Sequence, residues 1–66
     1  MSEDKIAQLE YAKKCYLRDL EPEKLAIVRK SFGLSVMCKR REWLKKQVKR
    51  CDEEIGGLRE QERLNN

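Results

Sequence analysis

Apolar residues recur every seven positions through the second half of this chain, and that spacing limits it to helical folds. The repeat and the apolar residues four positions after two of its members are Met37, Leu44, Val48, Cys51, Ile55 and Leu58. A repeat of seven places side chains along one stripe of an α-helix, whereas a half-buried strand needs a repeat of two. We therefore expect a long helix over residues 36–63, with these six residues as its packing seam and residues 64–66 frayed.

A first helix is expected over about residues 3–20. Its apolar residues fall on one side of a helical wheel, namely Ile6, Leu9, Ala12, Tyr16, Leu17 and Leu20. Lys13 is the one charged residue that intrudes on this stripe. Because a residue before proline is disfavoured in helical geometry, Glu21 is expected to end this helix.

A second, short helix is expected over about residues 22–32. Pro22 suits its first position, where the missing N–H would have no partner in any case. Leu25, Val28 and Phe32 line one face of this helix, and Ile27 points elsewhere. That placement indicates either wider burial or an exposed contact for Ile27.

Glycines mark two further points where a helix could end. Gly33 suits the position after a helix, and Ser35 is then expected to cap the third helix. The alternative is one continuous helix through Gly33. Gly56–Gly57 could also end a helix, but Leu58 beyond it keeps the heptad phase. A helix that stopped at these glycines would have three acids, residues 52–54, in its last turn, where the helix dipole disfavours negative charge. We expect a corner at Gly33 and a continuous helix through Gly56–Gly57.

These elements predict an all-α fold with a single domain over residues 1–66. It would be a helical hairpin or small three-helix unit with a long C-terminal heptad helix. A chain of this size buries only about 60% of its unfolded surface, so oligomerisation or docking on a partner is expected to complete it. The seam suits two uses, packing on the first helix within one chain or forming an intermolecular coiled coil, for example in a dimer.

Charge is concentrated over the same region. Residues 24–50 carry ten basic residues and one acid, a net charge of +9, while residues 1–23 carry −2 and residues 51–66 carry −3. The predicted basic face of the third helix consists of Lys39, Arg40, Arg41, Lys45, Lys46, Lys49 and Arg50. Such a face could bind nucleic-acid phosphates, with Trp43 stacking on a base, or an acidic protein surface, or an anionic membrane surface.

A purely solvated helix face is the other interpretation of these charges. Three acid–base pairs are spaced to stabilise it, namely Glu42–Lys46, Lys49–Glu53 and Arg50–Glu54. Three like-charged pairs at the same spacing oppose it, namely Arg41–Lys45, Lys45–Lys49 and Lys46–Arg50. Retained repulsion of this kind favours a binding role for the bases.

Residue types argue against catalysis and metal binding. The chain has no histidine, the commonest general base, and no glycine-rich phosphate loop after a strand. Its three cysteines form no Cys-x-x-Cys motif, so no metal site, cofactor or catalytic residue is expected. An odd number of thiols indicates a reducing compartment, either cytoplasmic or nuclear.

We therefore expect a small non-enzymatic helical interaction protein, such as an adaptor, an inhibitor or a regulatory subunit. It would bind a protein partner or a second copy through the seam and present its basic face to an acidic partner. The alternative is a nucleic-acid-binding regulator that uses the face from Lys39 to Arg50 on phosphates. Neither hypothesis includes a small-molecule substrate or a membrane-spanning segment.

Overall fold

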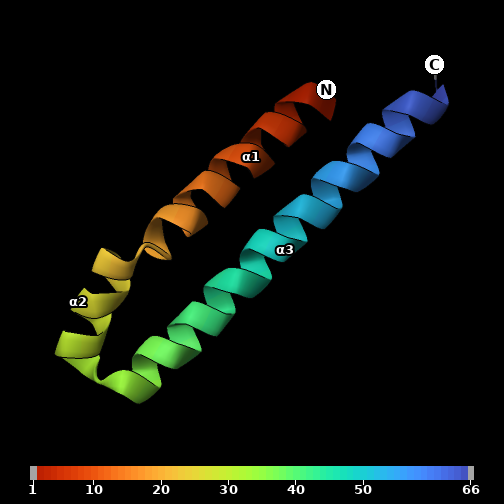
Figure 1. Cartoon of the computed structure of the whole chain (residues 1–66). Coiled ribbons are helices and arrows are strands. Elements are labelled where there is room, and N and C mark those ends of the chain that lie inside the picture. Colours follow the sequence, from red (N-terminus) through yellow and green to blue (C-terminus); the bar gives the residue numbers. More distant parts are fainter. Residues whose placement is uncertain (1, 66) are drawn as a thin grey trace.

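The computed structural model describes residues 2–65, and these form three helices and no strand. They are α1 (Ser2–Asp19), α2 (Pro22–Phe32) and α3 (Leu34–Asn65). The molecule is a narrow rod of 50 × 15 × 14 Å. As Figure 1 shows, α1 and α2 together form one arm and α3 forms the other, so the two ends of the chain lie at the same end of the rod. The predicted all-α hairpin with a long C-terminal helix is confirmed.

The break between α1 and α2 lies at the predicted position. Glu21 has φ −59° and ψ 141°, the extended geometry that the following proline favours. The N–H groups of Leu20 and Glu21 still donate to carbonyls of α1, and the carbonyl of Glu21 accepts the first hydrogen bond of α2 from Leu25 at 3.0 Å. Pro22 opens α2 as expected. The break therefore reorients the chain without leaving these backbone groups unpaired.

Gly33 makes the corner between α2 and α3. Its φ of 98° and ψ of 169° lie in a region that only glycine adopts readily. Its N–H donates to the carbonyl of Arg29 at 2.8 Å, and its carbonyl accepts from the N–H of Met37 at 3.1 Å. One residue thus closes α2 and opens α3. Ser35 was expected to cap α3, and this prediction is wrong, because Gly33 takes that position and Ser35 lies inside the helix.

The long helix continues through Gly56–Gly57, as the heptad phase predicts. Two glycines in a helix interior cost about 1 kcal/mol each relative to alanine. Burial of Ile55 and partial burial of Leu58 on either side offset this cost. Of residues 64–66, which we expect to fray, Leu64 and Asn65 continue the helix in the structure, and Asn66 lies outside the described residues.

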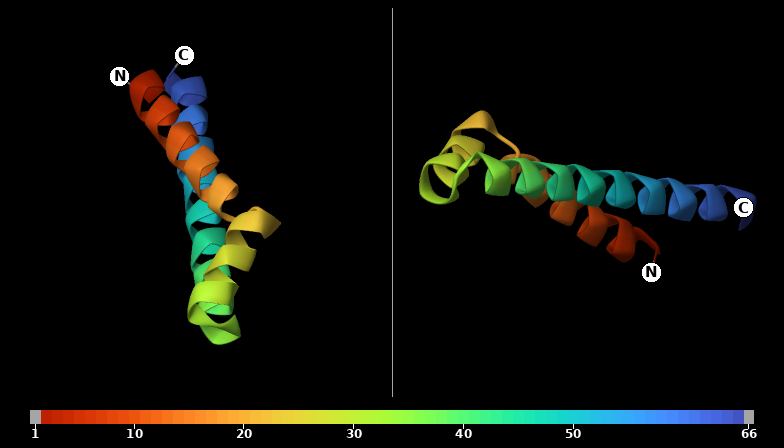
Figure 2. Two further views of the ribbon diagram at one scale, coloured as in Figure 1. Left: turned by 90° about the vertical axis from the view of Figure 1, so that its left-hand side faces the viewer. Right: turned by 90° about the horizontal axis from the view of Figure 1, so that it is seen from below.

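The two arms of the hairpin run antiparallel to each other, and α1 and α2 pack one after the other along α3. Figure 2 shows that α1 crosses α3 at a shallow angle and that α2 turns away from the direction of α1 to lie beside the first turns of α3. Contacts from Tyr16 to Trp43 and from Glu10 to Arg59 fix this order along the rod. The corner is therefore one end of the molecule, and the two termini lie toward the other.

Only a small core results from this two-layer packing. The buried apolar residues are Leu44, with 1% of its surface exposed, Cys51 with 7% and Ile55 with 6%, all on α3. The opposing arm has a partly buried row spaced alternately by three and four positions, namely Ile6, Leu9, Lys13 and Tyr16 on α1 and Leu20 just after it. Leu17 was expected on the apolar side of this helix but is 46% exposed.

The short helix α2 buries less than the sequence indicates. Leu25 and Val28 are partly buried, as expected, but Phe32 is 70% exposed. Phe32 is the last residue before the corner, and the chain turns away at Gly33 before any helix covers it. Ile27 is 62% exposed, so wider burial within this chain, one of the two interpretations of its position, is wrong.

Replacing Gly33 with alanine is expected to lower the free energy of unfolding by about 1–3 kcal/mol, because its backbone geometry is strained for any other residue. Gly56→Ala is the matched control: an added Cβ meets nothing within 4 Å at this helical position. It should raise stability by about 0.4–1 kcal/mol. Urea unfolding followed by circular dichroism at one protein concentration measures both. A Gly33→Ala protein as stable as the parent would contradict the corner.

Leu44→Ala is expected to cost about 2–5 kcal/mol, most of the stability of a chain this small, because it opens a cavity beneath α1. Ile27→Ala removes a mostly exposed side chain and should change stability by no more than about 0.5 kcal/mol. Thermal unfolding of the two variants measures the difference. Equal losses would show that the core lies elsewhere.

Candidate interaction surface

The six seam residues lie inside the hairpin. Leu44, Cys51 and Ile55 are buried against α1 within the single chain, and Met37, Val48 and Leu58 are partly buried beside them. Within the single chain, the seam therefore packs on the first helix, the intramolecular use that the sequence allows. A partner could reach the three buried residues only by displacing α1.

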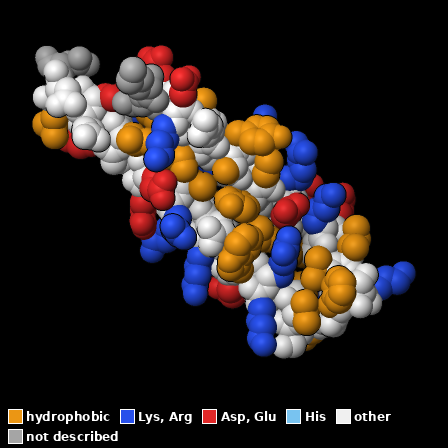
Figure 3. Space-filling view, turned by 180° about the vertical axis from the view of Figure 1, so that it is seen from behind, with side chains coloured by type: hydrophobic (Ala, Val, Ile, Leu, Met, Phe, Trp, Pro, Cys, Tyr) orange, Lys and Arg blue, Asp and Glu red, His pale blue; other side chains and the backbone are white. Residues whose placement is uncertain are grey.

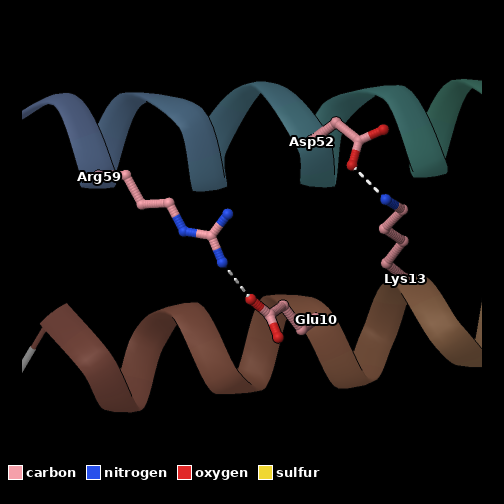
Figure 4. A network of polar contacts seen from close by, with 4 residues as sticks. All are labelled: Glu10, Lys13, Asp52 and Arg59. Atoms are coloured by element: carbon pink, nitrogen blue, oxygen red, sulfur yellow. Dashed lines mark hydrogen bonds and ion pairs between the residues drawn. The ribbon is translucent and has the colours of Figure 1, made fainter.

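Two ion pairs cross from α1 to α3 and flank this seam. Lys13 Nζ lies 2.6 Å from Asp52 Oδ1, and Arg59 Nη2 lies 2.7 Å from Glu10 Oε1 (Figure 4). The first pair explains why a lysine interrupts the apolar stripe of α1, since Asp52 follows buried Cys51 directly. Both pairs are partly or largely exposed, so each contributes about 1 kcal/mol at most, and their role is to favour one register.

Charge is segregated along the rod. We call residues 24–50 the basic segment: it contains most of α2, the corner and the N-terminal half of α3, and its net charge is +9. The rest of the described chain carries −5 and includes both terminal regions. The corner end is therefore strongly cationic, whereas the end with the termini is acidic.

Most bases of the basic segment are free to bind a partner. Arg41 is partly buried, and its Nε lies 3.8 Å from Glu42 Oε1. The other nine bases are exposed and form no ion pair within residues 2–65. None of the three acid–base pairs that would support a solvated face is within ion-pair distance in the described chain. The exposed bases are Lys24, Arg29, Lys30, Lys39, Arg40, Lys45, Lys46, Lys49 and Arg50.

Arg41 departs from the open basic face to which we assigned it. It occupies a heptad position between Met37 and Leu44, so its stem is drawn into the helix interface. Its Nη2 donates to Cys38 Sγ at 4.0 Å, and its Nε is buried without a hydrogen bond among the described residues. Arg41 is therefore less available to a partner than the other bases of this face.

Trp43 joins the helix interface to the basic surface. Its ring meets that of Tyr16 edge to face, with centroids 5.8 Å apart and planes at 88°. The guanidinium carbon of Arg40 lies 5.9 Å from the ring centroid, within cation–π range. The ring is still 48% exposed and borders a depression that Lys39, Lys46 and one acid, Glu42, also line. The stacking role predicted for Trp43 thus has an accessible ring surface beside free bases.

Exposed apolar residues gather in the same basic segment, which the sequence did not indicate. Five large apolar side chains between residues 27 and 43 are more than two-fifths exposed, namely Ile27, Phe32, Leu34, Val36 and Trp43. Figure 3 shows hydrophobic side chains interspersed with basic ones toward the corner end, at the lower right. The one available signal was Ile27, which fits no packing stripe in α2.

Within residues 2–65, no three cysteine, aspartate or glutamate side chains group as a metal site would require. None of the described helices is long and apolar enough to cross a bilayer. Comparisons with protein-family models, with curated proteins and with solved structures each gave no match.

Lys45→Gln is expected to stabilise the hairpin by about 0.2–0.5 kcal/mol, because it removes the like-charged pairs with Arg41 and Lys49 one helical turn away. Lys14→Gln is the matched control, since that exposed base has one acid and one base at the same spacing. Thermal unfolding at low salt measures the gain, which should shrink at about 0.5 M salt because of screening. A loss of stability in Lys45→Gln would contradict the unrelieved repulsion.

Proposed function

We propose that this chain is a small non-enzymatic interaction protein that binds an acidic protein partner through its basic segment. The observation that carries this proposal is the coincidence of nine exposed, unpaired bases with five exposed apolar side chains in residues 24–50. Bases alone give weak and salt-sensitive attraction, whereas apolar groups beside them supply affinity. The heptad seam then serves as the scaffold that holds this surface rigid.

The exposed area of the chain supports association. Its solvent-accessible surface is 5525 Å². A globular monomer of 7.9 kDa would expose only about 4,400 Å². The excess of about 1,100 Å² is more than the roughly 800 Å² that one partner buries in a standard protein interface. A narrow two-layer rod with so much surface gains stability whenever a partner covers it.

The mechanism we propose is occupancy without chemistry. The cationic corner would attract an acidic partner and speed its encounter, and the apolar side chains would then hold it. Such a protein acts as an adaptor, an inhibitor or a regulatory subunit. Its three free thiols suit a reducing compartment, the cytoplasm or the nucleus.

Nucleic-acid binding is the second candidate function, and the environment of Trp43 favours it. A half-exposed tryptophan ring beside Lys39, Arg40 and Lys46 combines a stacking surface with phosphate-binding charges. In this case Lys45, Lys49 and neighbouring bases would follow a phosphate backbone.

A binding titration separates the two candidates. The protein is mixed with mixed-sequence duplex DNA, with single-stranded RNA and with polyglutamate, each at about 50 and 200 mM salt. We expect binding to polyglutamate at low salt that Lys45→Glu with Lys49→Glu weakens, because these changes reverse two free charges. The control pair Lys5→Glu with Lys14→Glu makes the same charge change on α1.

Each result of this titration has a definite meaning. Nucleic-acid binding that is tighter than polyglutamate binding and falls steeply with salt would favour the second candidate. Equal loss in the two charge-reversed proteins would show that net charge alone, not the basic segment, attracts polyanions. Failure to bind any of the three polyanions at low salt would contradict both candidates.

A further inference from the structure

A groove runs along the open side of α2 and the first turns of α3. Two adjoining depressions form it, one bordered by Asp19 and Lys24 and the other by Phe32 and Val36, and they share Val28 and Arg40. We call this surface the elbow groove and define it by Lys24, Ile27, Val28, Phe32, Val36 and Arg40. Its apolar members project from α2 and α3 at helical spacing, four residues apart from Val28 to Phe32.

No part of the described chain covers the elbow groove. Helix α1 ends at Asp19, so it packs along α3 beyond the groove and leaves this side of α2 and α3 open. Ile27 is 62% exposed, Phe32 is 70% exposed and Val36 is 44% exposed.

Charge around the elbow groove determines what kind of occupant fits. Lys24 and Arg40 line it, and both are exposed without an ion pair in residues 2–65. Asp19 is the one acid that borders it, at the end next to α1. A second copy approaching with its own basic segment would bring two cationic surfaces together. An occupant with acids beside an apolar stripe would pair its acids with the two bases and pack its stripe on the apolar side chains of the groove.

We propose that the elbow groove binds an acidic amphipathic helix of a partner protein. This proposal rests on the proposed function, because it names the partner's chemistry and the site on the basic segment. A concave surface between two helices accepts a third helix, whose apolar residues at i, i+3 or i+4 and i+7 fit between Ile27, Phe32 and Val36. The flanking glutamates and aspartates of that helix then pair with Lys24 and Arg40.

The test uses two fluorescein-labelled synthetic peptides with one composition. One has leucines at i, i+3, i+4 and i+7 and glutamates elsewhere, and the other has the same residues scrambled so that no apolar stripe forms. Fluorescence anisotropy with the full chain measures both affinities. We expect the amphipathic peptide to bind at least about tenfold more tightly than the scrambled one, a difference typical of one buried anchor.

Variants of the chain then locate the binding site. Phe32→Ser should weaken binding of the amphipathic peptide at least about tenfold, whereas Tyr11→Ser, at a residue 71% exposed on α1, should leave it unchanged. Lys24→Glu should weaken binding more than Lys14→Glu, which makes the same charge change outside the groove. Circular dichroism confirms that each variant keeps its helices, and Ile27→Ser replaces Phe32→Ser if the latter does not fold.

The outcomes distinguish this proposal from the proposed function. If both peptides bind equally and Phe32→Ser has no effect, the elbow groove is not the site, but an acidic partner for the basic segment still stands. If neither peptide binds at low salt, both proposals are overturned. Phosphatidylserine vesicles form a third arm: vesicle binding that needs Phe32, without peptide binding, would assign the surface to an anionic membrane and overturn the helical occupant.

Discussion

Packing of α1 over Leu44, Cys51 and Ile55 is the interaction on which the rest of this structure depends. These residues lie within 12 positions of one helix, so a single short stripe holds the two arms together. The backbone geometry at Gly33 is strained for other residues. The turn there is stable only because the two arms that it joins pack on each other. Likewise, two glycines stay helical in α3 because their apolar neighbours are held against α1.

A core this small gives a low free energy of unfolding, so the arrangement of charge has a large relative effect on stability. Like charges one turn apart in α3 lower stability, and no ion pair in the described residues relieves them except at Arg41. The pairs that cross between the arms, Lys13 with Asp52 and Arg59 with Glu10, lie on the acidic part of the rod. Electrostatic support is therefore placed where the arms meet, while repulsion is kept on the surface that we assign to a partner.

Local chemistry explains why the sequence predicts the helices but not the surface. Pro22 restricts the residue before it, and Gly33 permits a turn that others resist, so both breaks can be read from single residues. Burial of Phe32 and Leu17 depends instead on how far an opposing helix extends and on its exact rotation. Lys13 interrupts the apolar stripe of α1 in the sequence, and its ion pair with Asp52, which explains this, depends on the register of α1 and α3. The elbow groove needs the end of α1 and the corner together, and neither alone predicts it.

The apolar residues that hold the hairpin together and those that line the elbow groove are different sets. Leu44, Cys51 and Ile55 are almost fully enclosed, whereas Ile27 and Phe32 are mostly exposed, although all five are apolar residues of helices. If exposure at the corner only reflected a poorly packed small protein, nothing would require bases to surround it. Lys24 lies beside Ile27 and Arg40 lies beside both side chains, and charged neighbours oppose their burial within the same chain. An acidic amphipathic partner removes that opposition, because it covers the apolar groups and neutralises the charges in one contact.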